Sequence, residues 1–467
     1  MVTQSQHTTP HSIKVDFSDE QTTSFSGLVL AERLASRLRF WTTLEKHLPH
    51  RAGFDWMTII KSMVSGLLTG AQGTYATQDL REDAALLSLL DLEGAPEEAT
   101  VWRATKGLGE MQRSGLLPQV QLRWTHNILA KANRKDLLRY GFFPVFADGS
   151  LLEGSRRREA TKYIKDKGEG LVWSTVFAGP LVAAQRLAEE GEGEETCVRE
   201  MLAGVVDSVL CPLRLRRLAL VLADSLHGDG PTLSEIERLC LHYIVGANKL
   251  TATAKALSEQ PATLWLETGP DASRGWSRSD VCVCWIQCGD WDKKRTLVGR
   301  RWMREGEMIW NYSGVMTDLE ESDVAHVMQA RRVDYAQAIW HLYDMKMGME
   351  TNYQDLLSDL NLHHPPCQEI VRNAGFYAVA TLAHTLARAV DLIGGQNPER
   401  GSRARKNGGR RKSPRPRGMR LWRLRRRLFS LPGRVATHAR VLKITLLGLS
   451  ESLRQEFERF FRTICRC

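Results

Sequence analysis

The chain contains 467 residues, 43% of them hydrophobic, and carries a formal net charge of +10. This length and apolar content are sufficient for two or three domains with hydrophobic cores. The first twelve residues are polar, and no segment reaches the roughly 18 uninterrupted apolar residues of a membrane helix. We therefore expect a soluble cytoplasmic protein with neither a signal peptide nor a membrane helix. Its nine scattered cysteines predict no disulfide framework.

The N-terminal third predicts a helical domain. Residues 1–25 have the composition of a flexible polar tail, and in 26–135 apolar residues recur at helical spacing in several segments. Short breaks containing Gly or Pro separate these segments. The last two flank a turn at 96–100 and could form a helix-turn-helix, although such turns also join helices in many bundles.

The pattern changes after residue 135 to strands that alternate with helices. Three continuous apolar runs, 142–149, 218–225 and 242–249, are separated by helical segments. Such runs are typical of a sheet covered on both faces, so residues 136–252 predict an α/β core. Thr232 and Glu235 predict a capping box at the start of the helix before the third run.

Residues 253–335 are rich in tryptophan and in β-like runs, which predicts an inserted sheet. Helical periodicity returns over 336–392. Cys282 and Cys284 fall on one side of a predicted strand, with Cys288 close by, and could either bind a metal or pack as small hydrophobic residues. No second Cys/His pair at zinc-like spacing follows, and this favours packing.

The positive charge is concentrated near the C-terminus. Residues 400–427 hold fourteen Lys/Arg and no acid, so subtracting them from +10 leaves −4 for the rest of the chain. A localised basic stripe of this kind releases counterions from a nucleic-acid backbone, and nucleic acid is therefore the favoured partner over a membrane surface. A solvated linker is the alternative. The cations that we select as candidate DNA-binding residues are Arg410, Arg411, Lys412, Arg425, Arg426 and Arg427.

Two aspartates end apolar runs in similar settings, Asp148 in FADGS and Asp224 in LADSL. Open α/β sheets bind ligands at the carboxyl ends of their strands, so neighbouring strands would bring these carboxylates together. Glu350 supplies a possible third carboxylate, on a helix where Tyr343 and Lys346 share its face. Three converging acids are hard oxygen ligands that suit Mg²⁺ or Mn²⁺. Asp229 is a nearby rival for the second position, but HGDGP has the composition of a turn.

Other chemistries lack their motifs. The sequence contains no G-x-x-x-x-G-K-[ST], G-x-G-x-x-G or G-x-S-x-G, which counts against a P-loop enzyme, a dinucleotide-binding enzyme and an α/β-hydrolase. Ser225 and His227 flank Asp224, but this spacing does not indicate a Ser-His-Asp triad.

The order of these features resembles the DDE transposases of bacterial insertion sequences, in the cut-and-paste group with a β-rich insertion before the catalytic glutamate. The glutamate helix of that group carries a Tyr–x2–Arg–x3–Glu–x6–Lys signature. Tyr343 and Glu350 match it, while Lys346 replaces the arginine and Leu357 replaces the lysine. Further similarity covers most of the chain, in the segments 73–90, 312–319, 373–390 and the arginine-rich region that follows.

The resemblance implies a ribonuclease H-like core, with the inserted β-rich subdomain and an N-terminal all-helical DNA-binding domain. Asp148, Asp224 and Glu350 would bind two Mg²⁺ ions, and Tyr343 and Lys346 would contact DNA phosphate. The core would comprise 136–252 and 336–392, followed by a basic linker at 393–424 and a C-terminal element at 425–467. The implied partners are transposon ends, target DNA and a second copy of the chain.

Two alternatives make different predictions. A non-catalytic DNA-binding relative of these transposases would bind DNA in a salt-sensitive way without cleaving it. A ribonuclease H-like nuclease of another purpose would cut DNA without regard to terminal repeats. Lys346 in place of the signature arginine keeps the positive charge but loses the bidentate fork, and Leu357 in place of the lysine removes a cation altogether.

Overall fold

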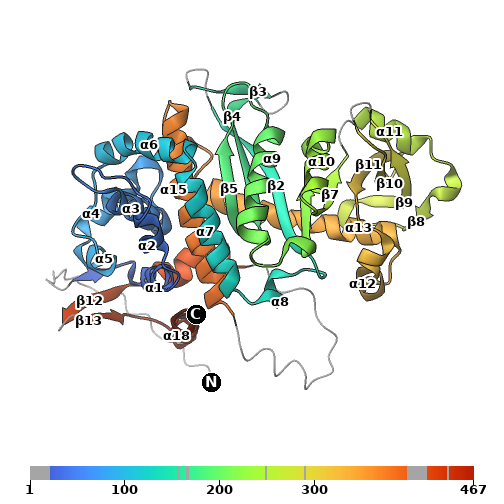
Figure 1. Ribbon diagram of the computed structural model, residues 1–467. Helices are drawn as coiled ribbons and strands as arrows, with labels where there is room; N and C mark the ends of the chain where they lie inside the picture. The colour runs from blue at the N-terminus through green and yellow to red at the C-terminus, as the bar shows by residue number, and fades with distance from the viewer. Residues whose placement is uncertain are drawn as a thin grey trace, which may run out of the picture.

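A computed structural model of the chain describes residues 21–154, 158–164, 168–247, 250–288, 291–396, 418–438 and 441–467. Its centre is a mixed sheet of ten strands, with helices on both faces (Figure 1). The predicted α/β class is therefore confirmed.

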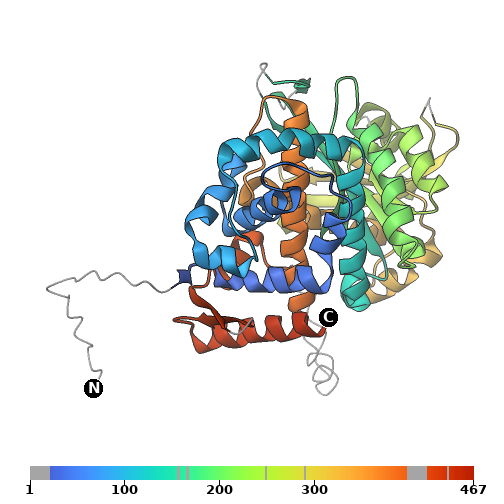
Figure 2. The same cartoon turned by 60° about the vertical axis from the view of Figure 1, so that its left-hand side comes forward.

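The N-terminal helices form a bundle beside the sheet (Figure 2). They are α1 Val29–Arg37, α2 Phe40–Glu45, α3 Trp56–Thr69, α4 Gln78–Glu82, α5 Ala84–Leu89, α6 Glu98–Arg113, α7 Leu116–Lys131 and α8 Arg134–Leu137. Helix α6 follows the turn where a helix-turn-helix was possible, and it packs closely against α15 (Ile370–Ala389). A Cβ added at Gly375 would lie 2.3 Å from the carbonyl oxygen of Thr105, so the two helices meet backbone to backbone. This face of α6 is therefore buried against another helix of the same chain.

The sheet combines parallel and antiparallel strands. Its members in spatial order are β3 Lys162–Ile164, β4 Gly168–Ala178, β2 Phe143–Glu153, β6 Ala219–Ala223, β7 His242–Gly246, β11 Asn311–Thr317, β10 Arg295–Arg304, β9 Trp276–Ile286 and β8 Leu266–Glu267, and β5 Leu181–Leu187 also pairs with β4. Strands β2, β6 and β7 run parallel to one another, and β4 runs antiparallel to β2. The three apolar runs of the sequence supply these buried parallel strands.

The β-rich insertion is joined directly to the central strands. Its strand β11 pairs antiparallel with β7, Val315 opposite Gly246, so the insertion extends the central sheet. This pairing satisfies the backbone groups along the edge of β7 that would otherwise be exposed. Cys282 and Cys284 are buried in β9 within the hydrophobic core, as expected for small apolar residues. Helices α11 Leu250–Ser258 and α12 Glu321–Arg331 flank these strands.

Helices cover both faces of the central strands. Helices α9 Glu194–Val205 and α10 Gly230–Arg238 lie in front of the sheet, and α13 Tyr335–Tyr343 passes behind it (Figure 1). The predicted capping box of α10 is wrong. The helix begins earlier, and its N-cap is Asp229, whose carboxylate accepts a hydrogen bond from the Thr232 backbone. Asp229 therefore has the local turn role that its sequence setting indicated.

Helix α15 runs through the core beside α6 and β5. With its continuation it spans Ile370–Gly394, the one helix among the described residues that is apolar and long enough to cross a membrane. Because 89% of its most apolar window is buried within the protein, its apolar surface is already covered. His384 and Arg388 are buried in this helix.

The C-terminal segment returns to the helical bundle. It contains α17 Leu421–Leu424, β12 Gly433–His438, β13 Val441–Leu446 and α18 Glu451–Arg466. Strand β12 pairs with the short β1 (Thr22–Thr23), so the two ends of the described chain share a three-stranded sheet. Helix α18 packs against α1 (Figure 2).

Candidate active site

The two predicted aspartates occupy adjacent positions on neighbouring parallel strands. Ala147 of β2 pairs with Ala223 of β6, and Asp148 and Asp224 are the next residues along each strand. Parallel strands lie about 4.8 Å apart, so the shared register brings both carboxylates to one part of the sheet edge. The negative charge of Asp224 accordingly raises the pKa of Asp148. This is the arrangement that the repeated Asp-ended runs predicted.

The helix that carries Glu350 also passes close to Asp148. A 3-10 turn at Asp344–Lys346 joins α13 to α14 (Met347–Gln354), so the predicted single helix is interrupted. Tyr343, Lys346 and Glu350 nevertheless all line one cavity of about 660 Å³, together with Asp148. Leu357 lines this cavity as well, whereas Asp224 lies outside its lining. The tyrosine hydroxyl donates to the carbonyl oxygen of Ala223, 3.3 Å away, which places Tyr343 next to Asp224.

The carboxyl group of Asp148 is difficult to ionise. Burial raises its pKa most, Asp224 and Glu194 raise it further, and Lys346 opposes them, with a net pKa of about 6. Nζ of Lys346 lies 3.6 Å from Oδ2 of Asp148. Such concentrated negative charge favours either a shared proton or a bound cation. Carboxylate oxygens are also the donors that Mg²⁺ prefers, so these residues fit a divalent metal.

Tyr353 connects the glutamate helix to the aspartate strand. Its hydroxyl donates to the backbone oxygen of Asp148 at 2.9 Å and lies 2.5 Å from Oγ1 of Thr175 on β4. Burial raises the pKa of Tyr353 well above its ordinary value, and the group remains a neutral donor. This hydrogen bond fixes α14 against β2. Glu350 lies three residues before Tyr353 on the same helix and is therefore held near Asp148.

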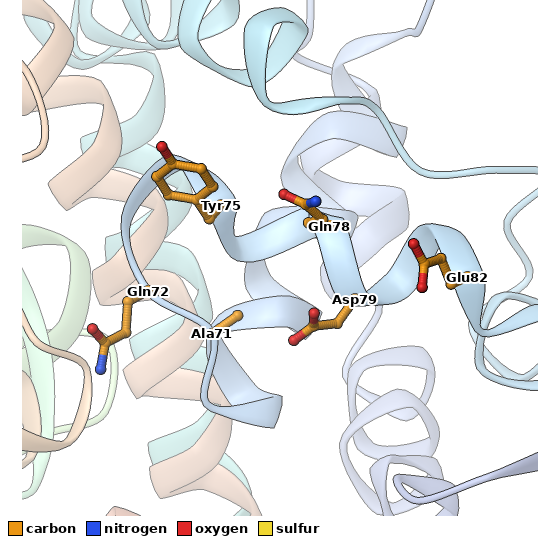
Figure 3. Close-up of a pocket in the computed structure, with 6 residues that line it drawn as sticks. All are labelled: Ala71, Gln72, Tyr75, Gln78, Asp79 and Glu82. Carbon is orange, nitrogen blue, oxygen red and sulfur yellow. The ribbon is translucent and has the colours of Figure 1, made fainter.

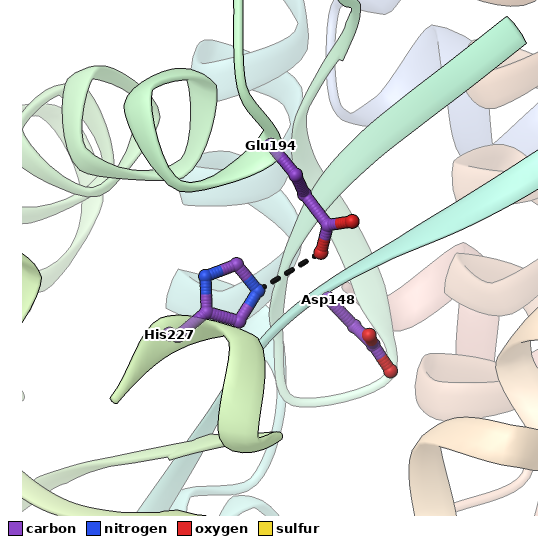
Figure 4. Close-up of side chains that lie close together, drawn as sticks. All are labelled: Asp148, Glu194 and His227. Atoms are coloured by element: carbon purple, nitrogen blue, oxygen red, sulfur yellow. Dashed lines mark ion pairs between the residues drawn. The ribbon is translucent and has the colours of Figure 1, made fainter. Parts of the chain in front are cut away.

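Glu194 and His227 belong to the same site, although the sequence analysis did not select them. Oε1 of Glu194, at the start of α9, lies 3.0 Å from Nε2 of His227 (Figure 4). Burial lowers the pKa of His227, but Glu194, Asp224 and Asp148 outweigh this and raise it overall. One signal was present in the sequence, since His227 follows Asp224 by three residues. Glu194 gave none, because its position depends on how α9 packs against the sheet.

The basic candidates are distributed differently. Arg410, Arg411 and Lys412 lie outside the described residues. Arg425 donates to the carbonyl oxygens of Leu67, Leu68 and Asp359, so its guanidinium is already used within the protein. Arg427 forms an ion pair with Glu456, and Arg426 is exposed.

A second hollow lies in the helical bundle, lined by Ala71, Gln72, Tyr75, Gln78, Asp79 and Glu82 (Figure 3). It measures about 420 Å³, and its two carboxylates come from the short helix α4. The carboxylates of this second hollow do not belong to the group of described residues that could hold a metal ion. That group consists of Asp148, Glu194 and His227. We therefore place the candidate active site at Asp148.

Similarity of this chain to known proteins is found among solved structures. No family model matches the chain, and no curated protein matches it. Among solved structures, a piggyBac transposase synaptic complex with hairpin DNA is similar over 88% of this chain and 83% of that chain, at 11% sequence identity and a TM-score of 0.39.

Proposed function

We propose that the chain is a DDE transposase that cleaves DNA at transposon ends and joins the freed ends to target DNA, with Mg²⁺ or Mn²⁺ as cofactor. The observation that carries the proposal is the shared register of Asp148 and Asp224, with Glu350 lining the same cavity as Asp148. These are the three residues that the resemblance assigns to catalysis.

The topology supports a ribonuclease H-like core. Strands β5, β4 and β2 are antiparallel in succession, and β6 and β7 then run parallel to β2 on its other side. Asp148 lies on the first of these strands in the chain and Asp224 at the end of the fourth. The insertion β8–β11 then precedes the helix of Glu350, in the order that the resemblance implies.

The residues at the proposed active site have different roles in the proposed reaction. Asp148, Asp224 and Glu350 would hold divalent cations, which activate an attacking oxygen and stabilise the leaving oxygen when bound. Lys346 offsets the negative charge beside Asp148 and can contact a phosphate, as can the hydroxyl of Tyr343. Such displacement requires no nucleotide hydrolysis, in agreement with the missing P-loop motif.

DNA is the proposed partner, in the form of terminal inverted repeats and target DNA. A homodimer that holds paired ends, in the nucleoid region of the cytoplasm, is part of the same proposal. Two observations favour the non-catalytic alternative. Lys346 already pairs with Asp148, and Leu357 lines the cavity at the position where the transposase group that this chain resembles has a lysine.

Cleavage of DNA that carries the element's own terminal repeats tests the proposal. The full chain should nick this DNA in Mg²⁺ or Mn²⁺, and Asp148→Asn, Asp224→Asn and Glu350→Gln should each lose activity by at least about 100-fold. Glu259→Gln, which alters an exposed carboxylate just after the end of α11, is the matched control and should cleave normally. Salt-sensitive binding without cleavage at any metal concentration would favour the non-catalytic alternative.

A further inference from the structure

His227 is a buried polar group whose chemistry the proposed function does not use. Its side chain is fully buried. Nε2 lies 3.0 Å from Oε1 of Glu194 and 4.0 Å from Oδ1 of Asp224. Nε2 and Oε1 are within ion-pair distance, yet neither makes a hydrogen bond of acceptable geometry within the described structure. A buried imidazole and a buried carboxylate oxygen without hydrogen bonds are costly unless another ligand satisfies them.

The fold makes specific room for Glu194. A Cβ added at Gly149 would lie 2.1–2.6 Å from the carboxylate atoms of Glu194, so any larger residue at this position would displace that carboxylate. Gly149 directly follows Asp148 in β2. The glycine therefore brings the carboxylate of Glu194 against the strand that carries Asp148, and this contact is independent of the one between Glu194 and His227.

The three side chains are close enough to share one cation. A single donor atom from each of Asp148, Glu194 and His227 lies within 4.8 Å of the other two. Donors that bind one ion at about 2.1 Å are about 3 Å apart at adjacent corners of an octahedron and about 4.2 Å apart across it. Small side-chain rotations would complete such a geometry. The set differs from the all-carboxylate set of the proposed active site because it contains an imidazole nitrogen.

We propose that Asp148, Glu194 and His227 form a divalent transition-metal site that takes Mn²⁺ in preference to Mg²⁺. Imidazole with carboxylates suits transition metals, whereas Mg²⁺ selects oxygen donors. The site shares Asp148 with the proposed active site, so a cation held there lies beside Glu350's cavity. Its existence does not depend on DNA cleavage, and it can be tested without DNA.

The direct test is the nitrogen signal of bound Mn²⁺. Mn²⁺ is titrated into the purified full chain, and electron spin-echo spectroscopy is used to detect ¹⁴N coupled to the ion. We expect ¹⁴N modulation in the wild type and its loss in His227→Gln. His242→Gln is the matched control, because His242 also pairs with a carboxylate, that of Asp318 at 3.0 Å, but on the far side of β6. It should retain the signal.

A second variant covers the case in which His227→Gln does not fold. Glu194→Gln keeps the shape of the side chain and should weaken Mn²⁺ binding by about tenfold or more. Absence of Mn²⁺ binding in the wild type, or bound Mn²⁺ without ¹⁴N modulation, would overturn the inference. Modulation from ¹⁴N that persists in a folded His227→Gln protein would also overturn the inference. Glu350→Gln should retain the nitrogen signal while losing cleavage, which separates failure of this site from failure of the proposed function.

Discussion

The hydroxyl of Tyr353 donates a hydrogen bond to the backbone oxygen of Asp148 across 2.9 Å. This bond joins the helix of one proposed metal ligand, Glu350, to the strand of another. Residues about 200 positions apart in the chain are thereby held in register. The distance between the carboxylates of Asp148 and Glu350 thus depends on Tyr353, a neutral side chain that is not itself a proposed metal ligand.

Tyr353→Phe removes this hydrogen bond and leaves the ring in place. We expect the free energy of unfolding to fall by about 1 kcal/mol, because one buried hydrogen bond is lost. Metal-dependent DNA cleavage should fall further than this loss of stability explains, since α14 is no longer fixed to β2. Urea denaturation and a cleavage assay with saturating Mg²⁺ measure the two effects.

Tyr335→Phe is the control for this prediction. The hydroxyl of Tyr335 donates to the backbone oxygen of Leu319 at 2.6 Å, and this contact lies outside the lining of the candidate cavity. It should cost a similar amount of stability and leave cleavage unchanged. Equal loss of cleavage in both variants would show that the Tyr353 contact has only a structural role.

The raised pKa of Asp148 predicts a pH dependence of stability in metal-free protein. Its folded-state pKa of about 6 lies above its ordinary value of 3.8, so the folded protein holds more protons than the unfolded chain between these values. The free energy of unfolding should therefore decrease as pH rises from about 4 to 6, by at most about 3 kcal/mol from this group. Asp148→Asn removes the penalty. Its melting temperature in EDTA should exceed that of the wild type at pH 7.5 and approach it near pH 4.

Metal addition provides the control within the same experiment. Mg²⁺ should raise the melting temperature of the wild type at pH 7.5, because a ligand that binds only the folded state stabilises it. It should raise that of Asp148→Asn much less. A melting temperature of Asp148→Asn below the wild type at pH 7.5 in EDTA would mean that the ion pair with Lys346 outweighs the cost of burying the carboxylate.

Leu357→Lys restores a cation to the cavity wall. Leu357 is half-buried and lines the cavity beside Tyr353, so a lysine there can extend its ammonium group towards a bound phosphate. We expect tighter DNA binding and a salt dependence steeper by about 0.9 in log–log slope, the value for one added phosphate contact. Binding titrations at several salt concentrations measure both. Leu266→Lys, on the exposed strand β8, should leave the slope unchanged.

The sequence could predict the parallel strands and their aspartates because both signals are local. An apolar run that ends in Asp identifies a buried strand and its terminus, and Asp148 and Asp224 each have this setting. Glu194 could not be found in this way, since its approach to Asp148 depends on the packing of α9 and on the missing side chain of Gly149. The pairing of β11 with β7 is likewise a long-range contact that no local pattern specifies.

Charge was the least informative local signal. Arg425 belongs to a basic run, which makes it a candidate for DNA binding, yet its N–H groups donate to the carbonyl oxygens of Leu67, Leu68 and Asp359. Burial of a guanidinium depends on neighbours distant in sequence, here from α3 and from the helical turn Asp355–Asp359 that follows α14. The composition of the run therefore does not distinguish arginines whose donors are used within the protein from those whose donors remain available to a ligand.

Arg420 links the C-terminal segment to the end of α14 and to the helical turn Asp355–Asp359 that follows it. Its guanidinium donates to Gln354 at 2.7 Å, to the buried Asp355 at 3.1 Å and to Asp359 at 2.8 Å. Asp355 also pairs with Arg388 of α15 at 3.1 Å. The last part of the predicted basic linker 393–424 is thus attached to α14 and to the residues that follow it.

Arg420→Gln should loosen this attachment. We expect a loss of about 1–3 kcal/mol of unfolding free energy, less than for a fully buried pair because the Arg420 side chain is 30% exposed. Amide hydrogen exchange of α14 should increase more than that of α9, since α14 ends at the broken contact. Arg454→Gln, which breaks an exposed pair with Glu458 on α18, should change stability by no more than about 0.5 kcal/mol. Unchanged exchange in α14 of Arg420→Gln would mean that Tyr353 and the core contacts of α15 suffice to hold the helix of Glu350 in place.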